Sequence, residues 1–124
     1  MSKRAQLSKP ESPNTPIENV QNGATVSPLN NFQFDVLDET TPVLVDFYAD
    51  LCAPCRALSP RLESLSRELA TKLKIVKVNI EDHPEVAAKY GIRSLPTLIR
   101  FEKGEPVRTF VGNPVGDALM NLAY

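Results

Sequence analysis

Two cysteines stand three residues apart in the segment Cys52-Ala53-Pro54-Cys55, and they are the only cysteines of the chain. The residues after them predict a helix, which places the pair at a helix N-terminus. Free backbone N–H groups and the positive end of the helix dipole favour a thiolate at Cys52 there. Cys55, one turn later, can reach the Cys52 sulfur. We therefore expect Cys52 to attack a substrate disulfide and Cys55 to release the reduced product from the mixed disulfide.

Two other interpretations of the cysteine pair stay open. Nearby cysteines can be inert, buried, small apolar residues, or they can form half of a metal site. A zinc site needs two further ligands, and the only histidine, His83, lies far along the chain. Such a site would require two subunits, so the sequence favours redox chemistry and no bound metal.

Asp46 is a carboxylate inside the apolar run of residues 43–49. Burial raises the pKa of a carboxyl group, which would let Asp46 exchange a proton near neutral pH. Because Asp46 precedes Cys52 by six residues on the strand that leads to the helix, it could accept the proton of Cys55. The alternative is a structural aspartate that is hydrogen-bonded or paired with Lys77 on the next strand. The two roles are compatible.

Pro96 lies at the entrance to a predicted strand, in the segment Ser94-Leu95-Pro96-Thr97. Proline is tolerated as the first residue of a strand, which is one interpretation. A cis bond before Pro96 would instead turn the backbone of Leu95 outward. The N–H and C=O groups of Leu95 could then pair with an extended substrate beside the cysteines.

The elements that position these residues follow from hydrophobic spacing and from helix and turn signals. Ser27 is predicted to cap a helix that starts at Pro28, and Val115 is predicted to face inward from the last helix. The expected elements are a strand at 24–27, a helix ending before Pro42, a strand at 43–49, a helix after the cysteines, a strand at 75–80, a short helix from Pro84 to Gly91, strands at 97–101 and 107–111, and a last helix.

These elements combine into one fold. Leucines recur at spacings of four, three and four after the cysteines, which predicts a helix with one buried stripe. A strand–helix–strand unit of this length predicts a parallel pair with a right-handed connection, and the last two strands predict an antiparallel hairpin. We therefore expect a mixed central sheet with helices on both faces, a three-layer α/β/α domain.

Composition limits the class of protein. The chain has 124 residues, 42% of them hydrophobic, and a formal charge of −1. This suits one domain and offers no basic surface for nucleic acid or an anionic membrane. No apolar run approaches the roughly 20 residues that span a bilayer.

Residues 1–23 are rich in proline, serine and asparagine, and we expect a disordered tail there and a folded domain over 24–124. A tail used for docking or targeting is the alternative. The segment lacks the apolar stretch of a secretory signal, and a transit peptide is a weaker alternative. The closely spaced cysteine pair indicates a reducing compartment, and we expect the cytoplasm.

Several segments of the sequence resemble the thioredoxin family. The segments that carry the resemblance are residues 43–49 leading to the Cys-x-Pro-Cys motif, then 90–97, 101–105 and 110–112. The resemblance implies the thioredoxin fold. It implies that Cys52 is the nucleophile, Cys55 the resolving thiol, Asp46 the buried acid/base and Lys77 its partner.

The resemblance also implies a substrate surface. Pro96 would be a cis proline facing the active site and Gly112 would line the substrate groove. Two positions of the active-site loop depart from the family pattern. Leu51 replaces a tryptophan, which removes an indole N–H and a flat contact face, and Ala53 replaces a glycine, which reduces backbone freedom. The expected substrate-binding residues are Leu51, Ala53, Pro54, Leu95, Pro96 and Gly112.

The resulting hypothesis is a monomeric, cytoplasmic thiol–disulfide oxidoreductase that reduces protein disulfides. Its partners would be disulfide-bearing proteins and a thioredoxin reductase, with no nucleic acid or membrane. It would need no cofactor besides the redox-active disulfide Cys52–Cys55. Two alternatives are an oxidase or isomerase of higher potential, which the loop departures suggest, and a non-catalytic binding module with the same fold.

Overall fold

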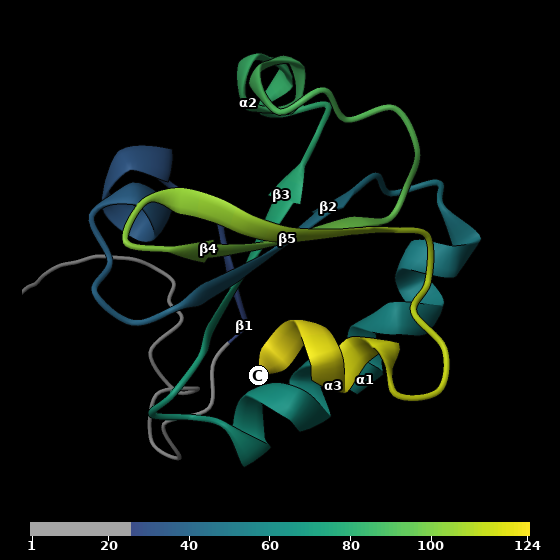
Figure 1. Cartoon of the computed structure of the whole chain (residues 1–124). Coiled ribbons are helices and arrows are strands. Elements are labelled where there is room, and N and C mark those ends of the chain that lie inside the picture. The colour runs from purple at the N-terminus through teal and green to yellow at the C-terminus, as the bar shows by residue number, and fades with distance from the viewer. Residues whose placement is uncertain (1–25) are drawn as a thin grey trace, which may run out of the picture.

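A computed structural model describes residues 26–124, and the predictions for residues 1–23 lie outside the described residues. These residues form a five-stranded sheet in the order β1-β3-β2-β4-β5, with helices around it (Figure 1). The elements in chain order are β1 (Val26–Pro28), η2 (Gln33–Leu37), β2 (Val43–Tyr48), α1 (Ala53–Glu68), β3 (Lys74–Asn79), α2 (Pro84–Lys89), β4 (Thr97–Glu102), β5 (Glu105–Val111) and α3 (Ala118–Ala123).

The central strand is β2, as its unbroken apolar sequence predicts. It pairs in parallel with β3 and antiparallel with β4. Five consecutive residues of β2, from Val43 to Phe47, are buried, because helices cover both faces of the sheet. The predicted parallel crossover and the predicted hairpin of β4 and β5 are both confirmed.

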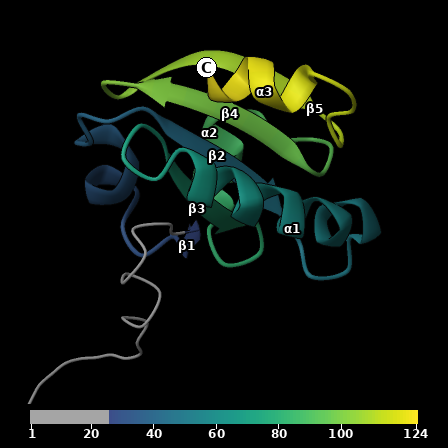
Figure 2. The ribbon, with the colours of Figure 1, turned by 90° about the horizontal axis from the view of Figure 1, so that it is seen from below.

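Two hydrophobic clusters fill the space between the sheet and its helices. On one face, Leu44, Ile75 and Leu98 of the sheet pack with the leucines of α1 and with α3. On the other face, Val45, Val76 and other strand residues pack with η2 and α2. Figure 2, seen from below, shows α1 over the β3 side of the sheet and α3 over the β4–β5 side. The three-layer α/β/α architecture is therefore confirmed.

The start of the folded region differs from the prediction. Ser27 and Pro28 belong to β1, which pairs in parallel with β3, and the first helix begins only at Gln33. The helical signal of a serine followed by proline is outweighed by the backbone pairing that the edge of β3 offers. Ser27 as a helix cap is therefore wrong.

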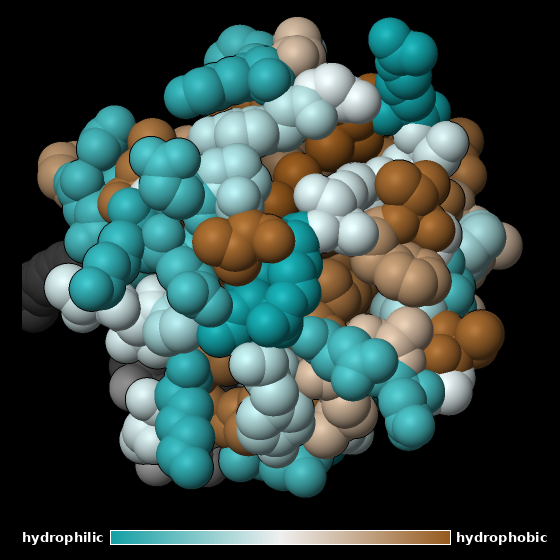
Figure 3. All heavy atoms as spheres, viewed as in Figure 1, coloured by the Kyte–Doolittle hydropathy of each residue, from teal (hydrophilic) through white to brown (hydrophobic). Residues whose placement is uncertain are grey.

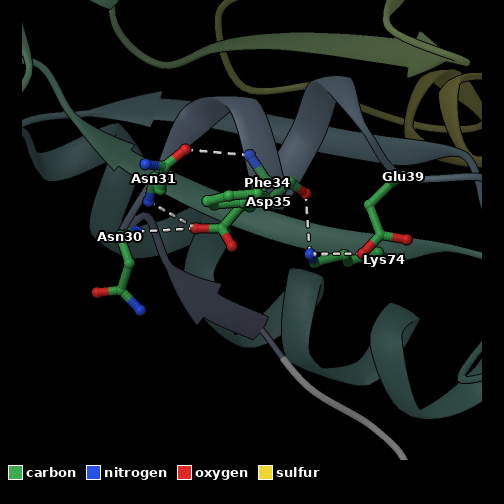
Figure 4. A network of polar contacts seen from close by, with 6 residues as sticks. All are labelled: Asn30, Asn31, Phe34, Asp35, Glu39 and Lys74. Carbon is green, nitrogen blue, oxygen red and sulfur yellow. Dashed lines mark hydrogen bonds and ion pairs between the residues drawn. The ribbon is translucent and has the colours of Figure 1, made fainter.

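Hydrogen bonds from the side chains of Asp35 and Lys74, and not a cap from Ser27, hold this first helix in place (Figure 4). The carboxylate of Asp35 accepts hydrogen bonds from the backbone N–H groups of Asn30 and Asn31, at 2.9 and 3.0 Å. Lys74, the first residue of β3, donates through Nζ to the backbone oxygen of Asp35 and to Glu39 Oε2, at 2.8 and 3.0 Å. The network ties η2 to the sheet at the end opposite to the start of α1.

The end of the chain also differs in detail from the prediction. Val115 is 75% exposed and precedes α3, which begins at Ala118, so its predicted inward position in the last helix is wrong. The C-terminal end of α3 is held by Arg100 of β4, whose Nη1 donates to the backbone oxygens of Leu122 and Ala123.

Among residues 26–124, no helix is both long enough and apolar enough to cross a membrane.

Candidate active site

The cysteine pair lies where β2 has ended and α1 begins. Cys52 is the N-cap of α1, with extended backbone angles, and a disulfide joins it to Cys55 with a Cα–Cα distance of 5.2 Å. Cys55 is only 3% exposed, whereas Cys52 is half-buried. An incoming disulfide can therefore approach Cys52, and Cys55 lies behind it. The predicted position at the helix start is confirmed.

The backbone of α1 provides the polar environment of the Cys52 sulfur. The backbone N–H of Cys55 donates to Cys52 Sγ at 3.2 Å. This N–H is one of the groups at a helix N-terminus that have no partner within the helix. A negatively charged sulfur accepts such a bond more strongly than a neutral one and also interacts favourably with the helix dipole. The geometry thus favours the thiolate of reduced Cys52, which is the reactive species.

Asp46 is fully buried on the face of β2 that α1 covers, between Lys77 of β3 and Leu98 of β4. Burial raises the pKa of its carboxyl group from 3.8 to about 6, and the charge of Lys77 partly opposes this rise. Neither carboxyl oxygen has a hydrogen-bond partner in the described part of the chain. A carboxyl group of this kind can take up and release protons near neutral pH.

Lys77 does not form the expected direct pair with Asp46. The two residues are neighbours in the β2–β3 register, yet Lys77 Nζ donates to Ser59 Oγ at 3.0 Å. It also lies 4.5 Å from the centroid of the Tyr48 ring. Among the described residues, Asp46 therefore has neither a hydrogen-bond partner nor a direct ion pair. The ammonium group acts on Asp46 only as a nearby charge.

Ser59 and Tyr48 are parts of the site that the sequence interpretation missed. Ser59 lies four residues after Cys55 in α1, and its hydroxyl donates to the backbone oxygen of Cys55 at 3.4 Å. A serine hydroxyl in a helix commonly bonds to the backbone oxygen four residues earlier, so the sequence spacing could have indicated this contact. The contacts of Lys77 with Ser59 and Tyr48 had no such signal, because the packing of α1 on the sheet creates them.

A cavity of about 280 Å³ opens beside the buried cysteine. It has both cationic and anionic groups in its wall, so it is polar near the cysteine sulfur. Its lining residues include Tyr48, Asp50, Cys55, Arg56, Ser59 and Lys77. The cavity is large enough to hold water next to Cys55 and Lys77.

Pro96 and Gly112 lie together at the same end of the sheet. Thr97 at the start of β4 pairs with Phe47 near the end of β2, so the residues before Thr97 lie on the side where α1 begins. The Leu95–Pro96 peptide bond is cis, as the family resemblance implied. Gly112, which has a φ of 96°, donates its backbone N–H to the oxygen of Pro96 at 2.7 Å.

Apolar side chains are exposed on three segments at this end. Leu51, in the turn before Cys52, is 98% exposed, and Ala53 and Pro54 are also exposed. Val111 ends β5, and Val115 lies in the loop that follows. Figure 3 shows hydrophobic residues gathered on the side of the molecule where α1 begins and the loop after β5 runs. This surface can contact an apolar segment of a substrate.

Arg61 connects the helix of the cysteines to that loop, a contact between distant segments that no local sequence pattern indicates. Its Nη1 donates to Asn113 Oδ1 at 2.9 Å and to the backbone oxygen of Pro114 at 2.5 Å.

Among residues 26–124, no group of three or more His, Cys, Asp or Glu side chains is arranged to hold a metal ion.

Comparisons with known proteins agree with this geometry. The family model described as Thioredoxin matches residues 24–123. Thioredoxin C-2 of Corynebacterium nephridii is 56% identical over 82 residues, which are 66% of this chain and 76% of that protein. The thioredoxin of Rickettsia bellii is 49% identical over 82 residues, 66% of this chain and 78% of that protein.

Solved structures show the same likeness. A mutant thioredoxin from Halobacterium salinarum superposes with a TM-score of 0.71 at 34% identity, covering 82% of this chain and 89% of that chain. The thioredoxin of Malassezia sympodialis gives a TM-score of 0.72 at 27% identity, covering 80% of this chain and 89% of that chain. With the Cys52–Cys55 disulfide at the start of α1, these matches establish that the chain belongs to the thioredoxin family of disulfide-reducing oxidoreductases.

Proposed function

We propose that this thiol–disulfide oxidoreductase reduces the disulfides of other proteins, with Cys52 as nucleophile and Cys55 as resolving thiol. The observation that carries the proposal is the pair's geometry at the start of α1. Cys52 is half-buried and its sulfur accepts a hydrogen bond from the backbone N–H of Cys55, whereas Cys55 is buried. One sulfur can therefore meet the substrate and the other can react only with Cys52.

The reaction proceeds in two exchanges. The Cys52 thiolate attacks one sulfur of the substrate disulfide, and the other substrate sulfur leaves as a thiolate. Cys55 then loses its proton and attacks the Cys52 sulfur of the mixed disulfide. The second substrate sulfur leaves, and the Cys52–Cys55 disulfide is formed. The substrate gains two electrons and the cysteine pair loses two.

Asp46 is proposed as the acceptor of the Cys55 proton. Its carboxyl group is unpaired, and burial raises its pKa to about 6, so the carboxylate is available as a base at neutral pH. Lys77 modulates this base through its charge. Both Cys55 and Lys77 line the cavity beside the pair, so water in that cavity supports transfer of the proton to and from solvent.

The substrate surface is proposed to consist of the exposed loop before and after Cys52 and the segments around Pro96 and Gly112. Leu51, Ala53 and Pro54 supply apolar contact area next to the reactive sulfur. In the described part of the chain, the N–H and C=O groups of Leu95 have no backbone hydrogen-bond partner. They can pair with an extended substrate segment.

The proposed electron donor is a thioredoxin reductase, and the proposed setting is the cytoplasm, with the protein acting as a monomer. The support for a protein-disulfide substrate and a reductase is membership of the thioredoxin family. The proposal needs no cofactor besides the cysteine pair, since the pair itself carries both electrons.

The experiment that tests the function is the midpoint potential of the Cys52/Cys55 couple. The protein is equilibrated in graded dithiothreitol buffers, alkylated and weighed by mass spectrometry, since the chain has no tryptophan to report by fluorescence. A value near roughly −270 mV supports a reductase. A value above about −200 mV supports an oxidase or isomerase instead. The absence of a reversible two-electron couple would leave a binding module.

A further inference from the structure

The hydroxyl of Ser59 links the helix that carries the cysteine pair to Lys77 of β3. It donates to the backbone oxygen of Cys55 at 3.4 Å and accepts a hydrogen bond from Lys77 Nζ at 3.0 Å. A serine hydroxyl has one proton to give and can accept at its oxygen, so both contacts can be made at once. Ser59 therefore fixes a lysine of the sheet to the helix that carries the cysteines.

The position of the Lys77 ammonium group is set by two contacts, and neither is with the nearest buried acid. Ser59 Oγ and the Tyr48 ring hold Nζ on the side of the cavity. Asp46 is the register neighbour of Lys77 on β2, and its oxygens have no hydrogen-bond partner within residues 26–124. A flexible lysine side chain next to a buried carboxylate would ordinarily pair with it, because that contact offers the strongest available attraction.

Other ionisable groups around the pair come from every neighbouring segment, and none of them takes the place of Ser59 as a partner of Lys77. They are Tyr48 of β2, Asp50 of the β2–α1 turn and Arg56 of α1, which line the cavity, and Asp82 after β3, whose charge acts on Tyr48. Asp50 accepts from Asn79, and Arg56 donates to the backbone oxygen of Asp50. Neither Asp50 nor Arg56 forms a hydrogen bond or ion pair with Lys77 among the described residues.

We propose that Ser59 is a positioning residue that holds the Lys77 ammonium group away from Asp46 and so keeps the Asp46 carboxyl group unpaired. The catalytic meaning of this arrangement rests on the proposed function, in which Asp46 accepts a proton from Cys55. The arrangement itself is a property of the folded, oxidised protein and can be measured without turnover.

Removal of the hydroxyl has a defined electrostatic consequence. In Ser59→Ala, Lys77 loses its only side-chain acceptor among the described residues and turns to the ionised carboxylate of Asp46. An opposite charge in contact stabilises the carboxylate, so the pKa of Asp46 falls. Burial still acts on Asp46, so the pKa moves from about 6 toward the ordinary value of a carboxyl group.

The test is a titration of Asp46 in the oxidised protein by carbon-13 NMR with labelled aspartate, with the signal assigned by its loss in Asp46→Asn. Ser59→Ala is expected to lower the pKa of Asp46 by about one pH unit. Ser59→Thr keeps a hydroxyl at this position and should restore the original value. Ser64→Ala is the matched control, since Ser64 lies in the same helix and contacts exposed Arg67 instead of Lys77.

A second background shows whether the effect passes through the lysine. Lys77→Met removes the ammonium group, and in that background Ser59→Ala should leave the pKa of Asp46 unchanged. An unchanged or raised pKa in Ser59→Ala alone, or an equal fall in both backgrounds, would overturn the proposal. Failure of the wild-type protein to reduce protein disulfides would overturn the proposed function and leave this titration result standing.

Discussion

Arg61 of α1 and Asn113 of the loop after β5 are joined by a hydrogen bond of 2.9 Å, although 52 residues separate them in the chain. The same guanidinium group donates to the backbone oxygen of buried Pro114. The helix that begins at the redox pair is thereby tied to the loop that follows Gly112. Two segments of the proposed substrate surface, one on each side of Cys52, are therefore connected through Arg61.

Replacement of Arg61 by methionine should loosen this connection. The change leaves two acceptors without their charged donor, which should cost about 1–3 kcal/mol of unfolding free energy. We also expect a higher KM for a protein disulfide, because the Gly112 loop is no longer fixed, with little change in kcat. Urea unfolding and steady-state kinetics measure the two effects. Arg67→Met, which removes an exposed arginine of the same helix, serves as control; equal effects of both variants would contradict the role of Arg61.

The buried carboxyl group of Asp46 should make stability depend on pH. Its pKa is higher in the folded state, about 6, than its ordinary value of 3.8, so ionisation opposes folding. Stability from this group is therefore full below about pH 4 and is lost as the pH rises through about 6. At about 1.36 kcal/mol per pH unit, the loss is about 3 kcal/mol.

The variant Asp46→Ala tests this linkage. Above pH 7 it should be more stable than the wild type in the oxidised form, by up to about 3 kcal/mol less the lost packing. It should also reduce substrates more slowly, because the proposed proton acceptor is gone. Urea unfolding between pH 4 and 8 measures the first effect. A destabilisation of more than about 1 kcal/mol at pH 8 would show that Asp46 stabilises the fold.

Leu51 should contribute to recognition of proteins but not to the exchange chemistry. Its side chain is almost completely exposed in this structure, so truncation to alanine removes contact area without disturbing the core. A loss of about 1 kcal/mol corresponds to a roughly fivefold lower kcat/KM for a protein disulfide. The rate with a small aromatic disulfide should stay within about twofold. Parallel losses with both substrates would indicate an effect on the Cys52 thiolate instead. Val107→Ala, on the exposed part of β5, is the control for a general surface effect.

Substitution of Cys55 by serine should trap the intermediate of the first exchange. Cys52 can still attack a substrate disulfide, but no thiol remains to release it. Mass spectrometry of the variant mixed with a disulfide-bearing protein should show a mixed disulfide through Cys52. In Cys52→Ser the remaining sulfur is buried, so this variant should trap little substrate. Equal trapping by both variants would contradict the division of roles.

The sequence by itself determined the class of fold and the chemistry of the reactive pair. The continuous apolar run of β2, the leucine stripe of α1 and the spacing of Cys52 and Cys55 are local patterns, and helices and strands form from such patterns. The parallel crossover from β2 through α1 to β3 then has essentially one handedness. These features needed no knowledge of distant contacts.

Local signals were insufficient where two elements compete for the same residues. Ser27 and Pro28 carry a helix-start signal, yet they join the sheet because β3 offers an edge for backbone pairing. Val115 fits a helical spacing with Leu119 and Leu122, yet α3 begins after it. A single residue at the boundary of an element is decided by small energies that tertiary packing readily outweighs.

Only the tertiary structure decided how the charges of the site are arranged. The sequence predicts Asp46 and Lys77 on neighbouring strands, and their pairing is one of the two compatible roles expected for Asp46. The packing of α1 on the sheet brings Ser59 to Lys77 and leaves Asp46 buried without a hydrogen-bond partner in the described chain. The physical reason is a difference in length scale. Whether a hydrogen bond forms depends on a few tenths of an ångström between side chains that come from distant segments. The spacing of residues along a chain fixes only which face of a helix or strand they occupy.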